Sequence, residues 1–358
     1  MYGDHSLRDL QTIFDFPGPR LENPLPLVGL NPNWEQPVTR RELWAACAGI
    51  AGGRLSYVSD SYLTYVPFSA HYIEVNGELV PIIRNTTDPV ISNNQTGMVF
   101  TRLSVLTPVM DANGAPLGSA DVLPSTTYFA YVSNSKAIYA PNSLRLSTTA
   151  PTNPVSGSGS VLLEHGSVPG VAKLAATGRA MTGRYLGNTG NARNWRFVGY
   201  VRSDPGGLFV DTAKQRFVIN CYNRRPLSLI AIDTTDSWVY STLTWRPWNN
   251  STANRVEFVA NGEEPVALTF IGQNAGSGRS IFGIGLDSTT AMAADCRPNS
   301  SGGNSPLIKG STNIYLGIPT EGYHYLQLLE AVSGNNTHYG DNGADGFTQA
   351  GANGWVMG

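Results

Sequence analysis

Residues 255–286 read RVEFVANGEEPVALTFIGQNAGSGRSIFGIGL, and this stretch decides the expected fold. Three runs rich in Val, Ile, Phe and Thr, at 255–259, 266–271 and 280–286, each have the length of a strand. The turn signal Asn261-Gly262 separates the first two runs, and a Gly-rich segment at 272–278 separates the second from the third. The spacing therefore predicts consecutive strands, with a flexible hairpin at 272–278.

Similar strand signals recur along most of the chain from residue 54. They include a hairpin at Asn76-Gly77, and lie at 63–68, 72–82, 97–109, 127–133, 143–147, 195–201, 215–220, 227–232, 238–245, 314–318 and 323–332. Only 14% of the 358 residues are charged, against roughly 25% in ordinary domains. That composition excludes long charged amphipathic helices. We expect a mainly β protein of short-stranded β-sandwich or jelly-roll-like domains.

The N-terminal segment has a different composition. Residues 14–37 contain six prolines, so we expect an extended arm rather than a helix. Apolar side chains that the arm cannot cover by itself are predicted to anchor it on another surface: Phe14, Phe16, Leu25, Leu27, Val28, Leu30 and Trp34.

One short helix is predicted over 38–50, where Thr39 and Glu42 form a capping box. Leu43, Cys47 and Ile50 lie on one apolar stripe of this helix. The stripe faces either the core of the same chain or other copies in an oligomer. We divide the chain into the arm and helix (1–53), a first β-domain with a linker (54–190) and a C-terminal β-domain with its tip (191–358).

The C-terminal tail, residues 333–358, is rich in Gly and Asn and has three large aromatic residues. Ordering each residue costs about 1–2 kcal/mol of backbone entropy, more than three buried aromatic side chains return. The tail is therefore predicted to be ordered only in an oligomer, with Tyr339, Phe347 and Trp355 at the interface.

No motif for catalysis, a metal or a cofactor stands out, and we expect none of the three. A glycosidase needs only two carboxylates, so Asp233 with Asp236 and Glu263 with Glu264 stay as weak candidates. Trp238 and Tyr240 are expected in the core. A candidate glycan-binding site is formed by Trp248, Asn249 and Asn250, because an aromatic face and amide groups suit a sugar.

Charge and cysteine content bear on partners and compartment. The net charge is −2 with no basic block, so we expect no nucleic-acid partner. No secretory signal or membrane-length apolar run is seen, which predicts synthesis in a cytoplasm and no membrane insertion. The three distant cysteines, Cys47, Cys221 and Cys296, are expected to be reduced.

Residues 196–224 carry a more specific pattern: VGYVRS at 198–203, FVD at 209–211, QRFV at 215–218 and YNR at 222–224. The pattern resembles a family of tailed-bacteriophage virion proteins that includes tail fibres, head fibres and minor tail proteins, with Ser203 in place of the usual threonine. The segments 63–77, 322–327 and 339–343 are similar to the same family, so that the resemblance covers about residues 60–345. Within the motif, Arg202, Asp211 and Arg216 are predicted to have structural roles.

The resemblance implies a non-enzymatic, trimeric fibre or spike in the virion, used for attachment to the host. Its partners would be other virion proteins (capsid, portal-proximal or tail proteins), further copies of itself and a host surface glycan. Two alternatives remain open, a carbohydrate-binding adhesin module and a capsid decoration (cement) protein. A polysaccharide depolymerase is the least favoured.

Overall fold

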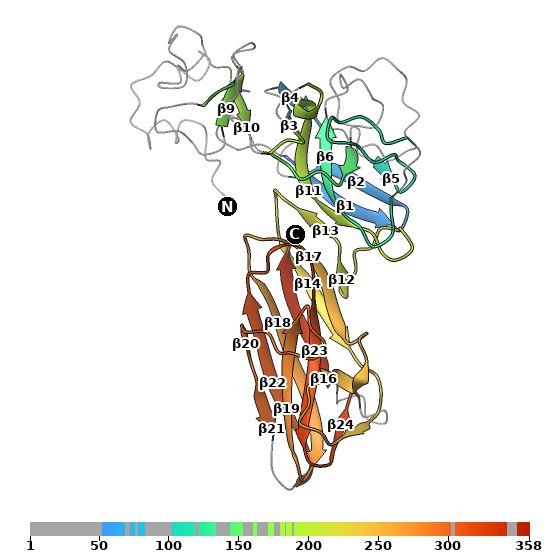
Figure 1. Cartoon of the computed structure of the whole chain (residues 1–358), viewed down its shortest axis with the longest axis vertical. Helices are drawn as coiled ribbons and strands as arrows, with labels where there is room; N and C mark the ends of the chain where they lie inside the picture. Colours follow the sequence, from blue (N-terminus) through green and yellow to red (C-terminus); the bar gives the residue numbers. More distant parts are fainter. Residues whose placement is uncertain are drawn as a thin grey trace, which may run out of the picture.

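The chain folds into several β-sheets that form two groups of strands (Figure 1). The structure is a computed structural model, and it describes residues 52–68, 72–75, 78–82, 102–118, 122–133, 144–152, 160–162, 171–174, 180–182, 184–187, 190–301, 305–341 and 349–358. These ranges contain 25 strands and two short 3₁₀ turns, η1 (Ala192–Asn194) and η2 (Trp248–Asn250). The mainly β prediction is confirmed. The predicted arm, the predicted helix and Phe347 lie outside the described residues.

The first group of strands forms the upper part of Figure 1. Its sheets contain β1 (Gly53–Ser59), β2 (Tyr62–Pro67) and β5 (Arg102–Ser104); β3 (Tyr72–Val75) and β4 (Glu78–Pro81); β8 (Ser160–Leu162), β9 (Val171–Leu174) and β10 (Ala180–Thr182); and β6 (Thr127–Ser133), β7 (Leu144–Ser147), β11 (Trp195–Arg202) and β13 (Val218–Asn220). In β3 and β4, Val75 lies opposite Glu78, which confirms the hairpin predicted there.

The second group forms two larger sheets in the lower part of Figure 1. The six-stranded sheet contains β12 (Gln215–Arg216), β16 (Arg246–Pro247), β17 (Arg255–Asn261), β19 (Arg279–Leu286), β21 (Asn299–Ser301) and β23 (Glu321–Ser333). The seven-stranded sheet contains β14 (Pro226–Ile232), β15 (Trp238–Tyr240), β18 (Val266–Gly276), β20 (Cys296–Arg297), β22 (Ser305–Gly317), β24 (Asn336–Tyr339) and β25 (Gly351–Met357).

Side chains from both larger sheets meet in one hydrophobic core. Phe270 of β18 and Phe282 of β19 contact each other edge to face, with ring centroids 5.7 Å apart. Leu229 of β14 and Leu328 of β23 belong to the same buried cluster. The cluster continues through Ile219 of β13 into the first group, so the two groups share packing.

Strand pairing connects segments on both sides of the predicted domain boundary at residue 191. β11 pairs along its whole length with β6, and β13 pairs with β11, so both strands belong to a sheet of the first group, whereas β12 between them pairs with β17 of the six-stranded sheet. The C-terminus lies beside the junction of the groups (Figure 1), where the Arg54 guanidinium donates a hydrogen bond to the Gly358 carbonyl at 2.8 Å. Asn220 exchanges two side-chain hydrogen bonds with the backbone of Leu55.

The Gly-rich segment 272–278 is also placed differently from the prediction. β18 continues to Gly276 and β19 begins at Arg279, and these strands belong to different sheets. The segment is therefore mostly strand followed by a tight crossing between sheets. Asn336 stabilises this crossing, because its side chain accepts a hydrogen bond from Gly278 N–H and donates one to Gly278 C=O.

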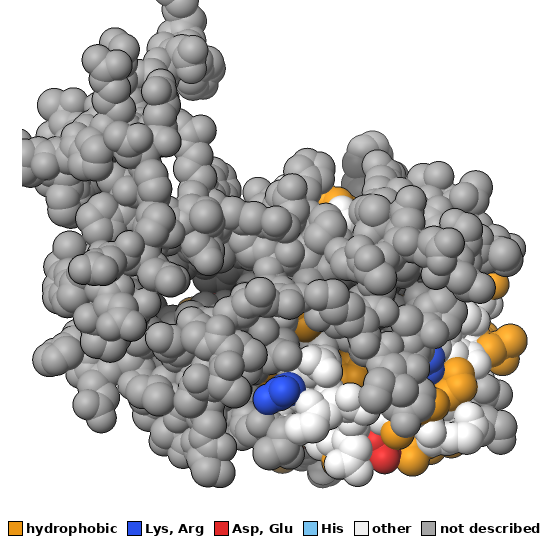
Figure 2. All heavy atoms as spheres, turned by 90° about the horizontal axis from the view of Figure 1, so that it is seen from above, with side chains coloured by type: hydrophobic (Ala, Val, Ile, Leu, Met, Phe, Trp, Pro, Cys, Tyr) orange, Lys and Arg blue, Asp and Glu red, His pale blue; other side chains and the backbone are white. Residues whose placement is uncertain are grey.

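Hydrophobic side chains are visible on the upper end of the molecule (Figure 2). The large exposed hydrophobic residues in the described part of 52–133 are Tyr57, Val58, Phe68, Leu106, Leu117 and Leu123. Within the described ranges, we find no helix with the length and apolar character that crossing a membrane requires.

Candidate self-association surface

The seven-stranded sheet carries large apolar side chains on both of its faces. Along β14, exposed and buried residues alternate, so Leu227, Leu229 and Ala231 enter the core while Ile230 and Ile232 point outward. A sheet with one face in water normally has polar residues at the outward positions. β14 departs from that pattern, and so do the strands beside it.

The strand register aligns the outward residues of four neighbouring strands into rows. In β14, β25, β18 and β22, successive pairing gives two rows: Ile230, Asn353, Thr269 and Ile314; and Ser228, Trp355, Ala267 and Leu316. Residues opposite each other in antiparallel strands have Cβ atoms about 4.5–5.5 Å apart. The outward side chains of the four strands therefore form one continuous surface of apolar and uncharged polar residues.

We call this outward surface of β14, β25, β18 and β22 the bare face. Its described side chains are Pro226, Ser228, Ile230, Ile232, Ala267, Thr269, Ile271, Gln273, Ile308, Gly310, Thr312, Ile314, Leu316, Gly351, Asn353, Trp355 and Met357. None of these residues is Asp, Glu, Lys or Arg, although Ile314 and Leu316 are 53% and 58% exposed. Loss of charge with gain of large apolar groups is typical of the centre of a protein contact.

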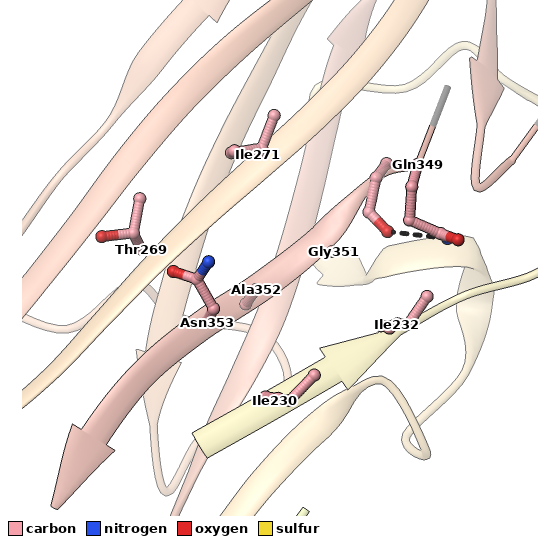
Figure 3. Close-up of a pocket in the computed structure, with 9 residues that line it drawn as sticks. Ile230, Ile232, Thr269, Ile271, Gln349, Gly351, Ala352 and Asn353 are labelled. Atoms are coloured by element: carbon pink, nitrogen blue, oxygen red, sulfur yellow. Dashed lines mark hydrogen bonds between the residues drawn. The ribbon is translucent and has the colours of Figure 1, made fainter. Parts of the chain in front are cut away.

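A shallow hollow of about 230 Å³ lies within the bare face above β25. Ile230 and Ile232 line one side and Thr269 and Ile271 the other, with Gly351 between them (Figure 3). Gly351 has a φ of +151°, and a Cβ there would lie 2.5 Å from the Ala231 carbonyl oxygen. The backbone therefore requires glycine at this position, and the missing side chain leaves the hollow open.

Two of the predicted interface residues lie on this surface. Trp355 is part of the bare face, and Tyr339 extends it because it pairs with Gln273. Leu43, Cys47, Ile50 and Phe347 lie outside the described residues, as do all the predicted anchor residues from Phe14 to Trp34. The structure thus brings Tyr339 and Trp355 onto one sheet.

The argument that the tail needs other copies to become ordered is wrong. β25 pairs on one side with β14 and on the other with β18, and β24 pairs with β15 and β18. These intrachain hydrogen bonds and the burial of Ala350 and Val356 provide the ordering that was assigned to neighbouring chains. Tyr339 and Trp355 are then surface residues of an ordered sheet.

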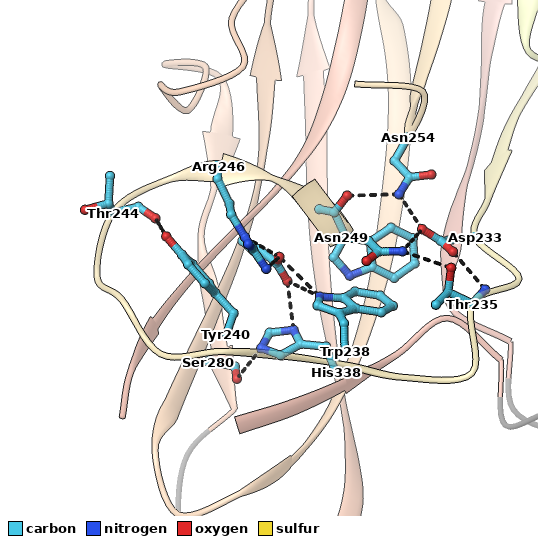
Figure 4. Close-up of polar contacts among 12 residues, drawn as sticks. Asp233, Thr235, Trp238, Tyr240, Thr244, Arg246, Asn249, Asn254, Ser280 and His338 are labelled. Atoms are coloured by element: carbon cyan, nitrogen blue, oxygen red, sulfur yellow. Dashed lines mark hydrogen bonds and ion pairs between the residues drawn. The ribbon is translucent and has the colours of Figure 1, made fainter. Parts of the chain in front are cut away.

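The candidate glycan-binding site is corrected as well. Trp248 is fully buried between Trp238 and Phe270, with ring centroids 5.2 and 5.1 Å away, so its indole is closed to a sugar. The Asn249 amide donates to Asp233 Oδ2 and Thr235 Oγ1, both at 2.9 Å (Figure 4). Only Asn250 remains exposed.

The carboxylates considered for glycoside hydrolysis make structural contacts. Asp233 also accepts hydrogen bonds from Asn254 and from the Thr235 backbone; although burial alone would raise it, these bonds hold its pKa below the usual range. Glu263 and Glu264 both lie within 3.6 Å of the Arg224 guanidinium. Asp236 is exposed at the surface.

A buried polar network joins β15 and β24 of the seven-stranded sheet to β16, β19 and β23 of the six-stranded sheet. Glu330 of β23 is fully buried; it lies 2.8 Å from Arg246, accepts a hydrogen bond from the Trp238 indole and lies 3.1 Å from His338 Nδ1 (Figure 4). Burial raises the pKa of Glu330 and lowers that of His338 to about 4. His338 is therefore neutral at pH 7, and Ser280 lies 3.4 Å from its Nε2. The network fixes the two sheets against each other.

The three motif residues that were predicted to be structural each form an ion pair or a hydrogen bond within the fold. Arg216 lies 3.4 Å from Asp211 and donates to the Ser228 carbonyl at 2.9 Å. Arg202 donates to Thr127 and packs over the Tyr323 ring at 3.8 Å. These contacts hold β11, β12 and β14 in place.

The apolar outward residues of the bare face were missed from the sequence. The signal is present in residues 227–232 (LSLIAI), where five of six residues are apolar and none is charged. A strand of that kind is predicted to be buried on both faces.

Comparison with known proteins finds no family model that matches this chain and no curated sequence that matches it.

Proposed function

We propose that this protein is a structural component of a tailed-bacteriophage virion, a fibre or spike that assembles as a homotrimer and has no enzymatic role. Its two large sheets fit a β-sandwich domain, and the Pro-rich arm would dock on other virion proteins. The observation that carries the proposal is the bare face, an ordered sheet surface without ionised groups. Such a surface favours permanent association of several copies over a free monomer.

The motif at 198–224 supports the virion assignment, because it gives the resemblance to phage appendage proteins. The site geometry favours no second function. The aromatic residue proposed for sugar stacking is buried, and the candidate carboxylates are engaged with neighbouring side chains or exposed singly.

The test is the position of the protein on virions of a phage that encodes it. Antibodies against the purified full chain, labelled with gold, should mark a tail or a head vertex in electron micrographs. Quantification of the virion proteins should give a multiple of three copies per vertex or tail. Uniform labelling of the capsid surface would identify a decoration protein instead. Absence of the chain from washed virions would contradict any structural role.

A further inference from the structure

The bare face contains two complementary shapes on opposite sides of β18. On one side lies the hollow above Gly351, lined by Ile230 and Ile232. On the other side β22 carries Ile314 and Leu316, both more than half exposed. The hollow is shallow and combines isoleucine side chains with the uncharged polar residues Thr269, Gln349 and Asn353, whereas the row on β22 presents exposed apolar side chains.

The size of the bare face suits contact with a protein of similar dimensions. Its four strands, from β14 to β22, span about 19 Å, and the 11 residues of β18 extend about 36 Å, giving a planar area of roughly 690 Å². A stable interface uses about 800 Å² on each partner, and the whole face of one copy, divided between its two neighbours in a ring, comes near that area. The described outward residues of these four strands have no charge with which to select an acidic or basic partner, and Arg297 of β20 lies opposite Ile314 at the edge of the face. An uncharged surface that holds both a protruding row and a hollow fits another copy of itself.

The direction of the symmetry axis that relates two copies determines which of their residues meet. An axis parallel to the strands keeps each residue at its own height, so a side chain meets the neighbour's residue from the same row. Ile314 and Ile230 belong to one row of the register, on the two sides of β18. In a ring, each copy offers its β22 side to one neighbour and its β14 side to the other, which is a head-to-tail contact.

We infer that copies of this chain associate head to tail through the bare face, with Ile314 of one copy packed in the hollow beside Ile230 of the next. The closure of the ring at three copies rests on the proposed function. The contact uses different halves of the face on the two partners, so neither half contacts itself.

Engineered cysteines test this contact in the full chain. Ile314→Cys combined with Ile230→Cys should give covalent trimers on non-reducing gels after mild oxidation. The two positions are three strand spacings apart within one chain, about 14 Å, which is beyond the reach of an intrachain disulfide. Each single variant and the wild type, which has three native cysteines, are the controls and should stay at the mass of one chain.

The other outcomes separate the inference from the proposed function. Covalent dimers alone from the double variant, or dimers from either single variant, indicate a two-fold contact and overturn the head-to-tail inference. A trimeric mass in light scattering without any cross-link overturns the inference and leaves the proposed trimer standing. A mass of one chain for the reduced double variant and for the wild type overturns both.

Discussion

The outer surfaces of the two large sheets differ in how they use charge. On the six-stranded sheet, Glu257 pairs with Arg255 and accepts hydrogen bonds from Gln215 at 2.6 Å and from Tyr323 at 2.7 Å. These bonds hold the pKa of Glu257 below its usual value, although burial alone would raise it. The bare face of the seven-stranded sheet has no ionised side chain among its described outward residues.

The charged outer surface of the six-stranded sheet is suited to contact with water. The bare face is suited to burial against another surface. Arg255 and Glu257 form an ion pair on the six-stranded sheet, and Arg246 and Glu330 form one in the buried network. Water satisfies the polar surface, whereas exposed isoleucine and leucine side chains gain free energy only when another surface removes them from water. The comparison therefore predicts that substitutions on the two sheets affect different properties.

The largest effect is expected from charges placed on the bare face. Ile314→Asp combined with Leu316→Asp should abolish assembly: Arg297 of β20 lies opposite position 314, but the carboxylate at 316 would be buried in the contact without a partner, which costs several kcal/mol of association free energy. Both positions are over half exposed in the single chain, so its fold should persist. Light scattering reports the mass, and circular dichroism reports the fold.

The matched control places a charge on the other sheet. Arg279→Asp changes an exposed position of β19 and should leave the assembly intact. If the two sets of variants assemble equally well, the bare face is not the contact surface. If the bare-face variant unfolds, Thr312→Asp, at an exposed position in the same strand, repeats the test with a smaller change in volume.

A smaller effect, on stability instead of assembly, is expected inside the molecule. Glu330→Ala should lower the free energy of unfolding by about 3–5 kcal/mol, since Arg246 loses the carboxylate that it pairs with in a buried site. Glu263→Ala, at an exposed carboxylate beside Arg224, should cost under about 1 kcal/mol. Denaturant unfolding measures both, and equal losses would contradict the structural role of the network.

The smallest effect concerns acid. The folded chain holds the pKa of His338 at about 4, below its value of 6.5 in an unfolded chain. The unfolded state therefore binds more protons between these values, and stability should fall by about 3 kcal/mol as the pH drops from 6.5 to 4. His338→Gln should remove that part of the pH dependence.

The pKa shift of Asp211 changes stability with pH in the opposite direction, over part of the same pH range. Burial raises its pKa to about 6, so its contribution to stability is present at low pH and is lost as the pH rises through 6. The contribution of His338 is therefore obtained from the difference between the wild type and His338→Gln at each pH. An unchanged slope in the variant would show that His338 is not the group responsible.

Local sequence signals predicted the strands better than their connections. Val, Ile and Phe runs identified β11, β17, β18, β19 and β23, because strand propensity and turn residues act over a few residues. The Gly-rich run at 272–278 suggested a hairpin, yet it crosses between sheets. That outcome depends on the long-range pairing of β18 with β22 and β25.

The candidate site was less predictable for a related reason. Whether Trp248 is buried depends on Trp238 and Phe270, which pack on it from other parts of the chain. The tail was expected to lack partners, but β14 and β18 provide both edges for β25. The bare face exists only once four strands lie in register, so no single segment revealed it.

The mass of the full chain in solution tests the central claim most directly. One chain has a mass of 38.4 kDa. Size-exclusion chromatography with light scattering at micromolar concentration should give three times that mass for the wild type. It should give the single-chain mass for the bare-face double Asp variant. A wild-type protein that remains folded at the mass of one chain across this range would contradict the account.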